Sequence, residues 1–260
     1  MKTPGQQKYY GIINATTEHW YGFSEYFEHA KSNLGVLIPS VSIVRRYTSD
    51  GRITQMEHYG YGKLEYTTEY KFNAENQLIG SLDLDPSGNP IRKSVSIFNK
   101  NGLLEEYFSY SDMVNVDFKM IFTYDPKGNE LSETIIHNNP DDNLTTFFEY
   151  DDNLTKSFTY DKKGKLIGKT MNVYDSIGNM ISSKDYNEFC ILSKEMTYSY
   201  DIHNNELVVE IKIHNDDGRE CFRREYEYSY DHLDNWVMAI HRTDNDDYAS
   251  VCIREIEYEN

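Results

Sequence analysis

The 260-residue sequence predicts an all-β protein, an antiparallel β-meander of about 15 to 17 strands with one N-terminal capping helix. Three observations carry this prediction. A turn motif recurs with a period near 26 residues, polar and apolar residues alternate between the turns, and the chain contains 23 Tyr and 12 Phe. Bulky aromatic side chains favour strands because they fit a pleated, half-buried surface.

The turn motif is an aromatic residue followed by Asp or Asn. Its copies are Phe72-Asn73, Phe98-Asn99, Tyr124-Asp125, Tyr150-Asp151, Tyr174-Asp175, Tyr200-Asp201 and Tyr230-Asp231, and their second residues lie 26, 26, 26, 24, 26 and 30 positions apart. Other turn sequences, such as "LDPSGN" and "HNDDGR", fall between these copies. Each of about eight repeats therefore contains two strands and two turns.

The letters of the motif predict the geometry of the turn. In Asp125-Pro126-Lys127-Gly128, Asp can bond the backbone ahead of it, Pro presets φ, and the fourth residue accepts the positive φ of a type I turn with a bulge. The fourth residues of the other copies all tolerate that region: Gly51, Asn76, Gly88, Gly102, Gly164, Gly178, Asn204 and Asp234. The copy at Tyr150 differs, and there we expect a two-residue turn at Asp152-Asn153.

Alternation along the strands gives each of them one apolar face. Tyr226, Tyr228 and Tyr230 point one way, and Glu227 points the other. At about 4.8 Å per strand, some 16 strands would span roughly 75 to 80 Å if the sheet were flat. Twisted open sheets rarely reach that width, so we expect a coiled sheet or a shell-like strip.

Residues 16–34 break the strand pattern. The apolar residues of this segment recur at helical steps: Trp20, Phe23, Phe27, Ala30 and Leu34. With Thr17 as N-cap and Gly35 after the last turn, we expect a helix over about residues 17–34 that covers an open end of the array. The expected domains are an N-terminal cap of residues 1–46, with this helix and a first strand, and a single repeat domain of residues 47–260.

The formal charge of −17 argues against a nucleic-acid partner, because such binding depends on basic groups that neutralise phosphates. It fits a solubility role or a basic protein partner. The N-terminus lacks the apolar run of a signal peptide, and the sequence has no stretch of about 20 apolar residues. We therefore expect a cytoplasmic chain without a membrane span, and a secreted or surface location stays open if a leader has been removed.

Cys190, Cys221 and Cys252 lie 31 and 31 positions apart. Three cysteines without a CxxC pair do not predict a disulfide framework or a zinc site. We interpret the spacing as repeat geometry, with one small apolar side chain recurring on equivalent strands.

Two acidic segments resemble cation sites. Asp83, Asp85, Ser87 and Gly88 imitate the first half of a calcium loop, but its twelfth position is Ser94 instead of the bidentate Glu. An ordinary turn is the better interpretation, and the run 244–247 (DNDD) is likewise interpreted as an acidic hairpin loop.

No motif predicts catalysis. The eight His residues form no HExxH motif, and the sequence has no GxSxG or phosphate-binding glycine loop. We expect no catalytic, cofactor or metal residues, although a pair of carboxylates that meets only in space would escape this reading.

The aromatic residues offer the other functional reading. Trp20, Trp236 and the Tyr ladders could stack on sugar rings, although aromatic residues at strand spacing usually serve packing. A solvent-facing aromatic row would favour carbohydrate binding, and a buried row would favour packing.

The passages "FTYDKKGKLIGKTMNVYDSIGNMISS" and "LDLDPSGNPI" resemble the RHS/YD-repeat family over about residues 47–260. That resemblance implies strands that spiral into a shell or strip, used in large bacterial proteins to enclose toxins or to bind at surfaces, with no catalytic residues to carry over. A weaker likeness, suggested by "YGYGKLEY", is to the YwqK-type antitoxin proteins built of MORN-like repeats, whose Gly-x-Trp elements are missing here.

The expected function is that of a bacterial, non-enzymatic repeat scaffold that binds another protein through its sheet face or an acidic loop edge. The alternatives are a carbohydrate-binding module and a toxin-neutralising partner.

Overall fold

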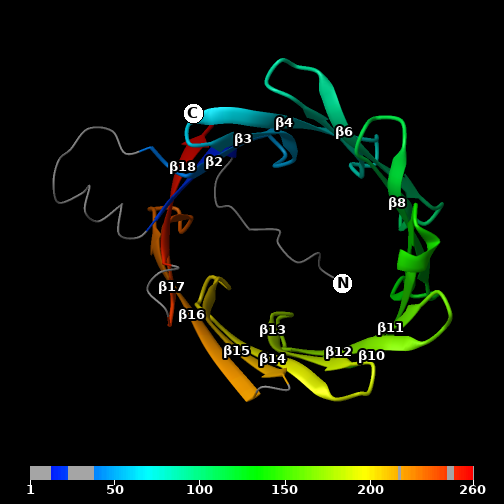
Figure 1. Cartoon of the computed structure of the whole chain (residues 1–260). Coiled ribbons are helices and arrows are strands. Elements are labelled where there is room, and N and C mark those ends of the chain that lie inside the picture. The colour runs from blue at the N-terminus through cyan, green and yellow to red at the C-terminus, as the bar shows by residue number, and fades with distance from the viewer. Residues whose placement is uncertain (1–12, 23–37, 216–217, 245–248, 260) are drawn as a thin grey trace. The chain divides into compact units, whose positions relative to one another are not determined.

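The computed structural model describes residues 13–22, 38–215, 218–244 and 249–259 (Figure 1). These residues form two compact units. The first unit contains residues 94–215 and 218–223, and the second contains residues 13–22, 38–93, 224–244 and 249–259. The boundaries between the units fall within strands β6 and β16.

The described residues form eighteen strands and one short 3₁₀ turn, η1 (Pro140–Asp142). The strands are β1 (Ile13–Gly22), β2 (Val41–Tyr47), β3 (Ile53–Gly60), β4 (Lys63–Phe72), β5 (Leu78–Leu84), β6 (Pro90–Phe98), β7 (Leu104–Tyr110), β8 (Val116–Tyr124), β9 (Glu130–His137), β10 (Leu144–Asp151), β11 (Leu154–Asp161), β12 (Leu166–Tyr174), β13 (Met180–Asn187), β14 (Leu192–Tyr200), β15 (Glu206–Asn215), β16 (Gly218–Tyr230), β17 (Trp236–Thr243) and β18 (Ser250–Tyr258).

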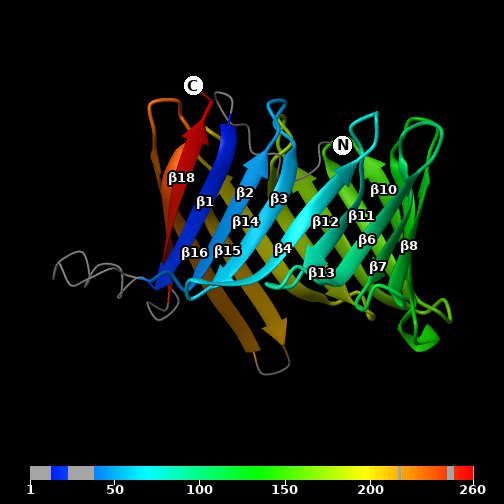
Figure 2. The ribbon, with the colours of Figure 1, turned by 90° about the horizontal axis from the view of Figure 1, so that it is seen from above.

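Within the first unit, each strand from β7 to β14 pairs antiparallel with the strand that follows it in sequence. This is the predicted meander. Within the second unit, β2 to β5 pair in the same consecutive way, and so do β16, β17 and β18. Strand β1 lies between β18 and β2 and is hydrogen-bonded to both (Figure 2).

The position of β1 overturns the predicted fold class in two respects. A meander or strip would leave its first and last strands as edges, whereas here the first strand pairs with the last over nine residue pairs, from Ile13↔Tyr258 to Gly22↔Ser250. The predicted capping helix is also wrong where it can be compared, because residues 17–22 belong to β1. Residues 23–34, the remainder of that helix, lie outside the described residues.

The reason for the helix error is competition between two patterns in the same residues. Trp20 begins the helical stripe, but it also belongs to a segment, Thr16 to Tyr21, that is rich in β-branched and aromatic residues and suits a strand. In the structure Trp20 lies opposite Cys252 on one side and Val41 on the other. Pairing with two neighbouring strands satisfies the backbone N–H and C=O groups of β1, and this stabilises the strand over the helix that the apolar spacing predicts.

The turn prediction is confirmed. All nine predicted fourth residues have positive φ, for example +86° at Gly128, +62° at Asn76 and +59° at Asp234. Ten turns share the same two backbone hydrogen bonds, in which the first residue accepts from the fourth and donates to the fifth, as in Gly128 N to Asp125 O at 3.0 Å and Asp125 N to Asn129 O at 2.9 Å. The predicted two-residue turn is also present, since Asp151 pairs with Leu154 and Asp152 has φ of +45°.

The first residue of the turn has a structural role. The Asp125 carboxylate accepts hydrogen bonds from the backbone N–H groups of Lys127 (2.8 Å) and Asn129 (2.9 Å), and from the Asn129 side-chain amide (2.9 Å). The bond from the Asn129 side chain, together with those backbone N–H groups, holds the pKa of Asp125 below its usual value. The same pattern explains why Asn so often follows the turn glycine.

The tyrosine of the motif also has a repeated contact. The Tyr124 hydroxyl donates to the carbonyl of Leu104, and the Tyr200 hydroxyl donates to the carbonyl of Met180, both at 2.7 Å. Each carbonyl belongs to the first residue of the neighbouring strand. The motif thus bonds the end of one strand to the start of the strand beside it.

The most deeply buried side chains lie in the second unit, on β1 and β18. Thr16, Val251 and Cys252 are less than 2% exposed. Beside them, Glu18 accepts from Arg254 at 2.5 Å and pairs with Arg45 at 3.1 Å. Because removal of one partner of a buried ion pair leaves an uncompensated charge, this contact favours the observed register of β1 against β18.

Gly164 offers a clean test of the turn geometry. Its φ is +77°, and a Cβ built there would meet nothing within 4 Å, so a substitution acts through the backbone alone. We expect Gly164→Val to lower the free energy of unfolding by about 1 to 2 kcal/mol, because a β-branched residue resists positive φ. Gly164→Asn is the matched control and should cost little, since Asn occupies the same place at Asn76 and Asn204. Equal urea-unfolding curves for wild type and Gly164→Val would contradict this assignment.

Candidate functional site

Four side chains form a row across neighbouring strands of the first unit. Phe147 on β10 lies opposite Phe158 on β11, Phe158 lies opposite Lys169 on β12, and Lys169 lies opposite Tyr186 on β13. We call Phe147, Phe158, Lys169 and Tyr186 the aromatic row. Since neighbouring strands are about 4.8 Å apart, the row extends over roughly 14 Å of one sheet face.

Two turns place these residues opposite one another. The tight turn at Asp152-Asn153 pairs Asp151 with Leu154, and counting back from it brings Phe147 to Phe158. After the turn at residues 161–165, a bulge between Thr159 and Tyr160 shifts the register by one residue and brings Phe158 opposite Lys169. The bulge therefore decides which side chains share this face.

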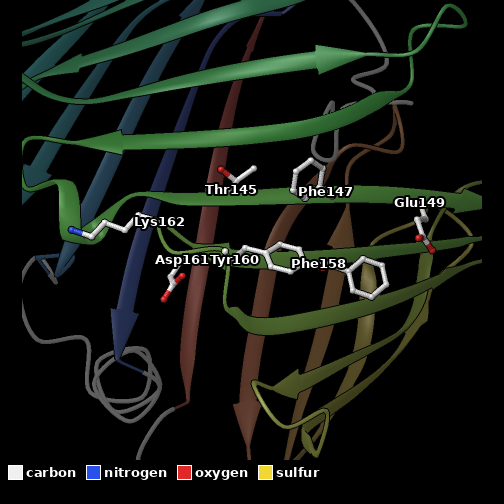
Figure 3. Close-up of a pocket in the computed structure, with 8 residues that line it drawn as sticks. Thr145, Phe147, Glu149, Phe158, Tyr160, Asp161 and Lys162 are labelled. Carbon is white, nitrogen blue, oxygen red and sulfur yellow. The ribbon is translucent and has the colours of Figure 1, made fainter.

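The β10–β11 end of the row lies beside an open hollow of about 470 Å³. Figure 3 shows the rings of Phe147, Tyr160 and Phe158 next to one another on these two strands. The Phe147 side chain is exposed, at 49%, and its ring lies edge-on to that of Tyr160 with centroids 5.8 Å apart. The remaining lining residues are Thr145, Glu149, Asp161, Lys162 and Gly164.

Carboxylates and lysines surround these rings. Lys162 is paired with Asp141. The Asp161 carboxylate accepts from the backbone N–H groups of Lys163 (2.8 Å) and Lys165 (2.9 Å). Glu149 is exposed and lines the hollow beside the rings. The hollow therefore combines aromatic faces with groups that can donate and accept hydrogen bonds.

The ammonium group of Lys169 lies between two rings. Its Nζ is 5.6 Å from the centroid of Phe158 and 5.3 Å from that of Tyr186. These distances are within the range of cation–π attraction. Among the residues that the structure describes, Lys169 makes no ion pair.

The neighbouring strand β9 carries two carboxyl groups with perturbed pKa values on the opposite face of the sheet. Burial, reinforced by the neighbouring Glu133, raises the pKa of Glu130 to about 7, and burial also raises the pKa of Glu133. Glu133 lies opposite Thr146, which is adjacent in sequence to Phe147 and so points to the other side of the sheet. A bulge in β9 places Glu130 opposite Tyr124, on the same side as Glu133, so neither carboxyl group lines the hollow.

The residues of the predicted calcium-like segment do not converge. Asp83 lies on β5, where it bonds to Thr68 (2.7 Å) and pairs with Arg92 (2.9 Å). Asp85 begins the following turn and accepts from the backbone N–H groups of Ser87 and Asn89. Gly88 is the fourth residue of that turn, with φ of +83°. Each carboxylate thus has its own partners, and Ser94 lies further along β6.

The other predicted features are scattered. Asp244 follows β17, and residues 245–247 lie outside the described residues. Cys190 is the fourth residue of a turn with φ of +60°, Cys221 is exposed on β16, and Cys252 is buried on β18. The interpretation of the cysteines as one position on equivalent strands is therefore wrong. No group of three or more His, Cys, Asp or Glu residues suited to a metal ion occurs within the described ranges.

The tryptophans and the Tyr ladder serve packing. The Arg254 guanidinium lies over the Trp236 ring, 3.2 Å from its centroid, and Trp20 belongs to the paired strand β1. Tyr226 stacks on His241 with centroids 4.9 Å apart, and Tyr228 contacts Trp236 at 6.1 Å. The rings that face solvent in the hollow are a different set, which the sequence reasoning missed.

Within the described part of the chain, no helix is both long and apolar enough to cross a membrane.

Comparison with known proteins gives only distant structural likenesses. No protein-family model matches the sequence, and no curated protein matches it. The structure is similar to a TcdB2–TccC3 Tc toxin component (17% identity, TM-score 0.38) and to the Photorhabdus luminescens Tc holotoxin pore (18% identity, TM-score 0.38). These matches cover 80% and 96% of this chain but only 12% and 13% of theirs, so the chain spans about an eighth of their length.

A third likeness is to a porin-like protein from Bacteroides uniformis, at 11% identity and a TM-score of 0.44, covering 94% of this chain and 98% of that one. No family model matches either predicted resemblance, RHS/YD or MORN-like, and the Tc toxin components are distant likenesses in fold alone.

The raised pKa of Glu130 predicts how the free energy of unfolding varies with pH. Its pKa rises from 4.5 to about 7 on folding, so the folded chain binds more protons than the unfolded chain between these values, and stability falls as pH rises from about 4.5 to 7. Glu130→Gln should remove part of this loss and raise the free energy of unfolding at pH 8 by on the order of 1 kcal/mol, a figure already reduced for partial exposure. Urea unfolding at pH 4, 6 and 8 measures it. A variant less stable than wild type at pH 8 would contradict the assignment.

Proposed function

We propose that this chain is a non-enzymatic carbohydrate-binding protein, and that a sugar ring stacks on the exposed ring of Phe147 and the half-buried rings of Phe158 and Tyr160. The single observation that carries the proposal is the solvent-facing hollow formed by these rings on β10 and β11. Rings gathered in an open hollow leave their faces available to a ligand, whereas rings that serve packing lie against other side chains.

The chemistry of the lining supports a sugar as the ligand. A pyranose ring has an apolar C–H face that suits an aromatic surface, and its hydroxyl groups need donors and acceptors at the edge of that surface. Glu149, Thr145 and Lys162 supply carboxylate, hydroxyl and ammonium groups beside the rings. A purely apolar ligand would gain nothing from them.

The non-enzymatic part of the proposal rests on the position of the carboxyl groups. General acid catalysis at neutral pH favours a carboxyl group with a raised pKa. Glu130 and Glu133 have raised pKa values, but they point to the other face of the sheet. A sugar in the hollow would therefore lie out of their reach.

The test compares two adjacent phenylalanines on β10. Phe147 faces the hollow, and Phe148 points to the opposite face and is less exposed. On a glycan array followed by titration calorimetry, we expect wild type to bind a defined set of glycans, and Phe147→Ala to weaken binding about fivefold to tenfold, as the loss of roughly 1 kcal/mol or more of ring contact implies. Phe148→Ala should bind as wild type does, and thermal melting controls for folding. If no glycan binds, or if Phe147→Ala binds like wild type, the proposal fails.

A second function, binding to another protein, is favoured by exposed apolar side chains at two neighbouring turns. Ile177 and Ile202 are 61% and 92% exposed. Their turns are joined by a hydrogen bond of 3.1 Å from the Asn179 amide to the Asn204 side-chain oxygen. Large apolar groups held together at a surface are typical of protein contacts.

Affinity capture from the native host tests this second function. A double variant, Ile177→Ser with Ile202→Ser, should lose any partner that binds this edge while keeping glycan binding. A partner retained equally by the double variant would show that the edge formed by the two turns is not its binding site.

A further inference from the structure

Lys169 lies between two aromatic rings on its sheet face. On that face of the first unit, Lys119 pairs with Glu106 at 2.6 Å and Lys184 pairs with Glu195 at 3.0 Å. Lys169 has rings on both sides instead, and among the described residues it has no carboxylate partner.

The rings on either side hold Lys169 in place without consuming its donors. A cation near an aromatic face is attracted by the ring quadrupole, and its N–H groups stay available to an acceptor. Phe158 and Tyr186 lie directly opposite Lys169 on the two neighbouring strands. The ammonium group therefore lies 5.6 Å from the centroid of the Phe158 ring and 5.3 Å from that of Tyr186.

We infer that the saccharide bound by this face is acidic, with its ring stacked on Phe158 or Tyr186 and its carboxylate accepting hydrogen bonds from Lys169 Nζ. This inference rests on the proposed carbohydrate-binding function. In a uronic acid the carboxylate is attached directly to the pyranose ring and projects from its edge. A ring stacked on the aromatic row thus brings its carboxylate beside Lys169, where a charge-assisted hydrogen bond can form.

The charge of the whole chain makes this arrangement selective. With a formal charge of −17, the protein repels polyanions at long range, but that repulsion is screened beyond about 8 Å at physiological ionic strength. For a carboxylate within hydrogen-bonding distance of Lys169, the attraction to the ammonium group is stronger than the screened repulsion by the rest of the chain. We therefore expect short acidic oligosaccharides to bind better than long, highly charged polymers at low salt.

The experiment uses ligands that differ only in charge. Trimers of galacturonate, glucuronate and mannuronate are compared with their methyl esters by titration calorimetry on the full chain. Wild type should bind at least one acid about threefold to tenfold more tightly than its ester, the range of a partly exposed charge-assisted bond. Lys169→Met should abolish this preference and retain binding of the ester, and Lys169→Gln provides a second neutral variant if the first folds poorly.

Lys119→Met is the matched control. Lys119 lies on the same face and its Nζ is 5.0 Å from the Phe108 ring centroid, but it is paired with Glu106. Its loss should leave the preference unchanged. If wild type binds esters and acids equally, or if the preference persists without Lys169, the inference is wrong while carbohydrate binding stands. If no saccharide of any kind binds, both fall together.

Discussion

The positive φ of the fourth turn residue is the constraint on which the other features depend. Each such residue closes a turn of fixed length. In most of these turns the first residue is Asp or Asn and its side chain accepts from the backbone N–H groups two and four residues ahead, as Asp125 does. A turn of fixed length and a bulge of one residue fix the register of the strands on either side. Because side chains alternate along a strand, register also fixes which residues share a face.

The two faces of the first unit then have different chemistry. One face carries the motif tyrosines, such as Tyr124 and Tyr200, whose hydroxyl groups bond neighbouring strands and whose pKa values are raised by burial. The other face carries the aromatic row and the paired lysines Lys119 and Lys184. The repeated motif residues therefore set the turns and the strand register, and the residues that alternate with them form the face on which the proposed ligand site lies.

The sequence predicts the repeated features well and the single ones poorly. The turns at Asn76 and Gly164 depend on the backbone preferences of four or five consecutive residues, so a short stretch of sequence is enough to predict them. The strand at Trp20 depends on pairing with residues more than 200 positions away. The local spacing of apolar residues around Trp20 therefore predicted a helix, which was wrong. The pairing of Phe147 with Phe158 could have been found, because the predicted turn at Asp152-Asn153 already implies it. The exposure of Phe147 could not, since it depends on how the neighbouring side chains fill the face.

Many of the acidic side chains have structural roles in the turns and the sheet. Carboxylates such as those of Asp125, Asp201 and Asp231 accept hydrogen bonds from their own turns, so their lone pairs are already engaged in holding the register. Others, such as Glu106 and Glu195, are paired with lysines. The formal charge of −17 therefore overstates how many carboxylates are available to a basic partner. Lys169, which has no carboxylate partner among the described residues, lies on the same sheet face as the exposed ring of Phe147, and the proposed recognition is placed there.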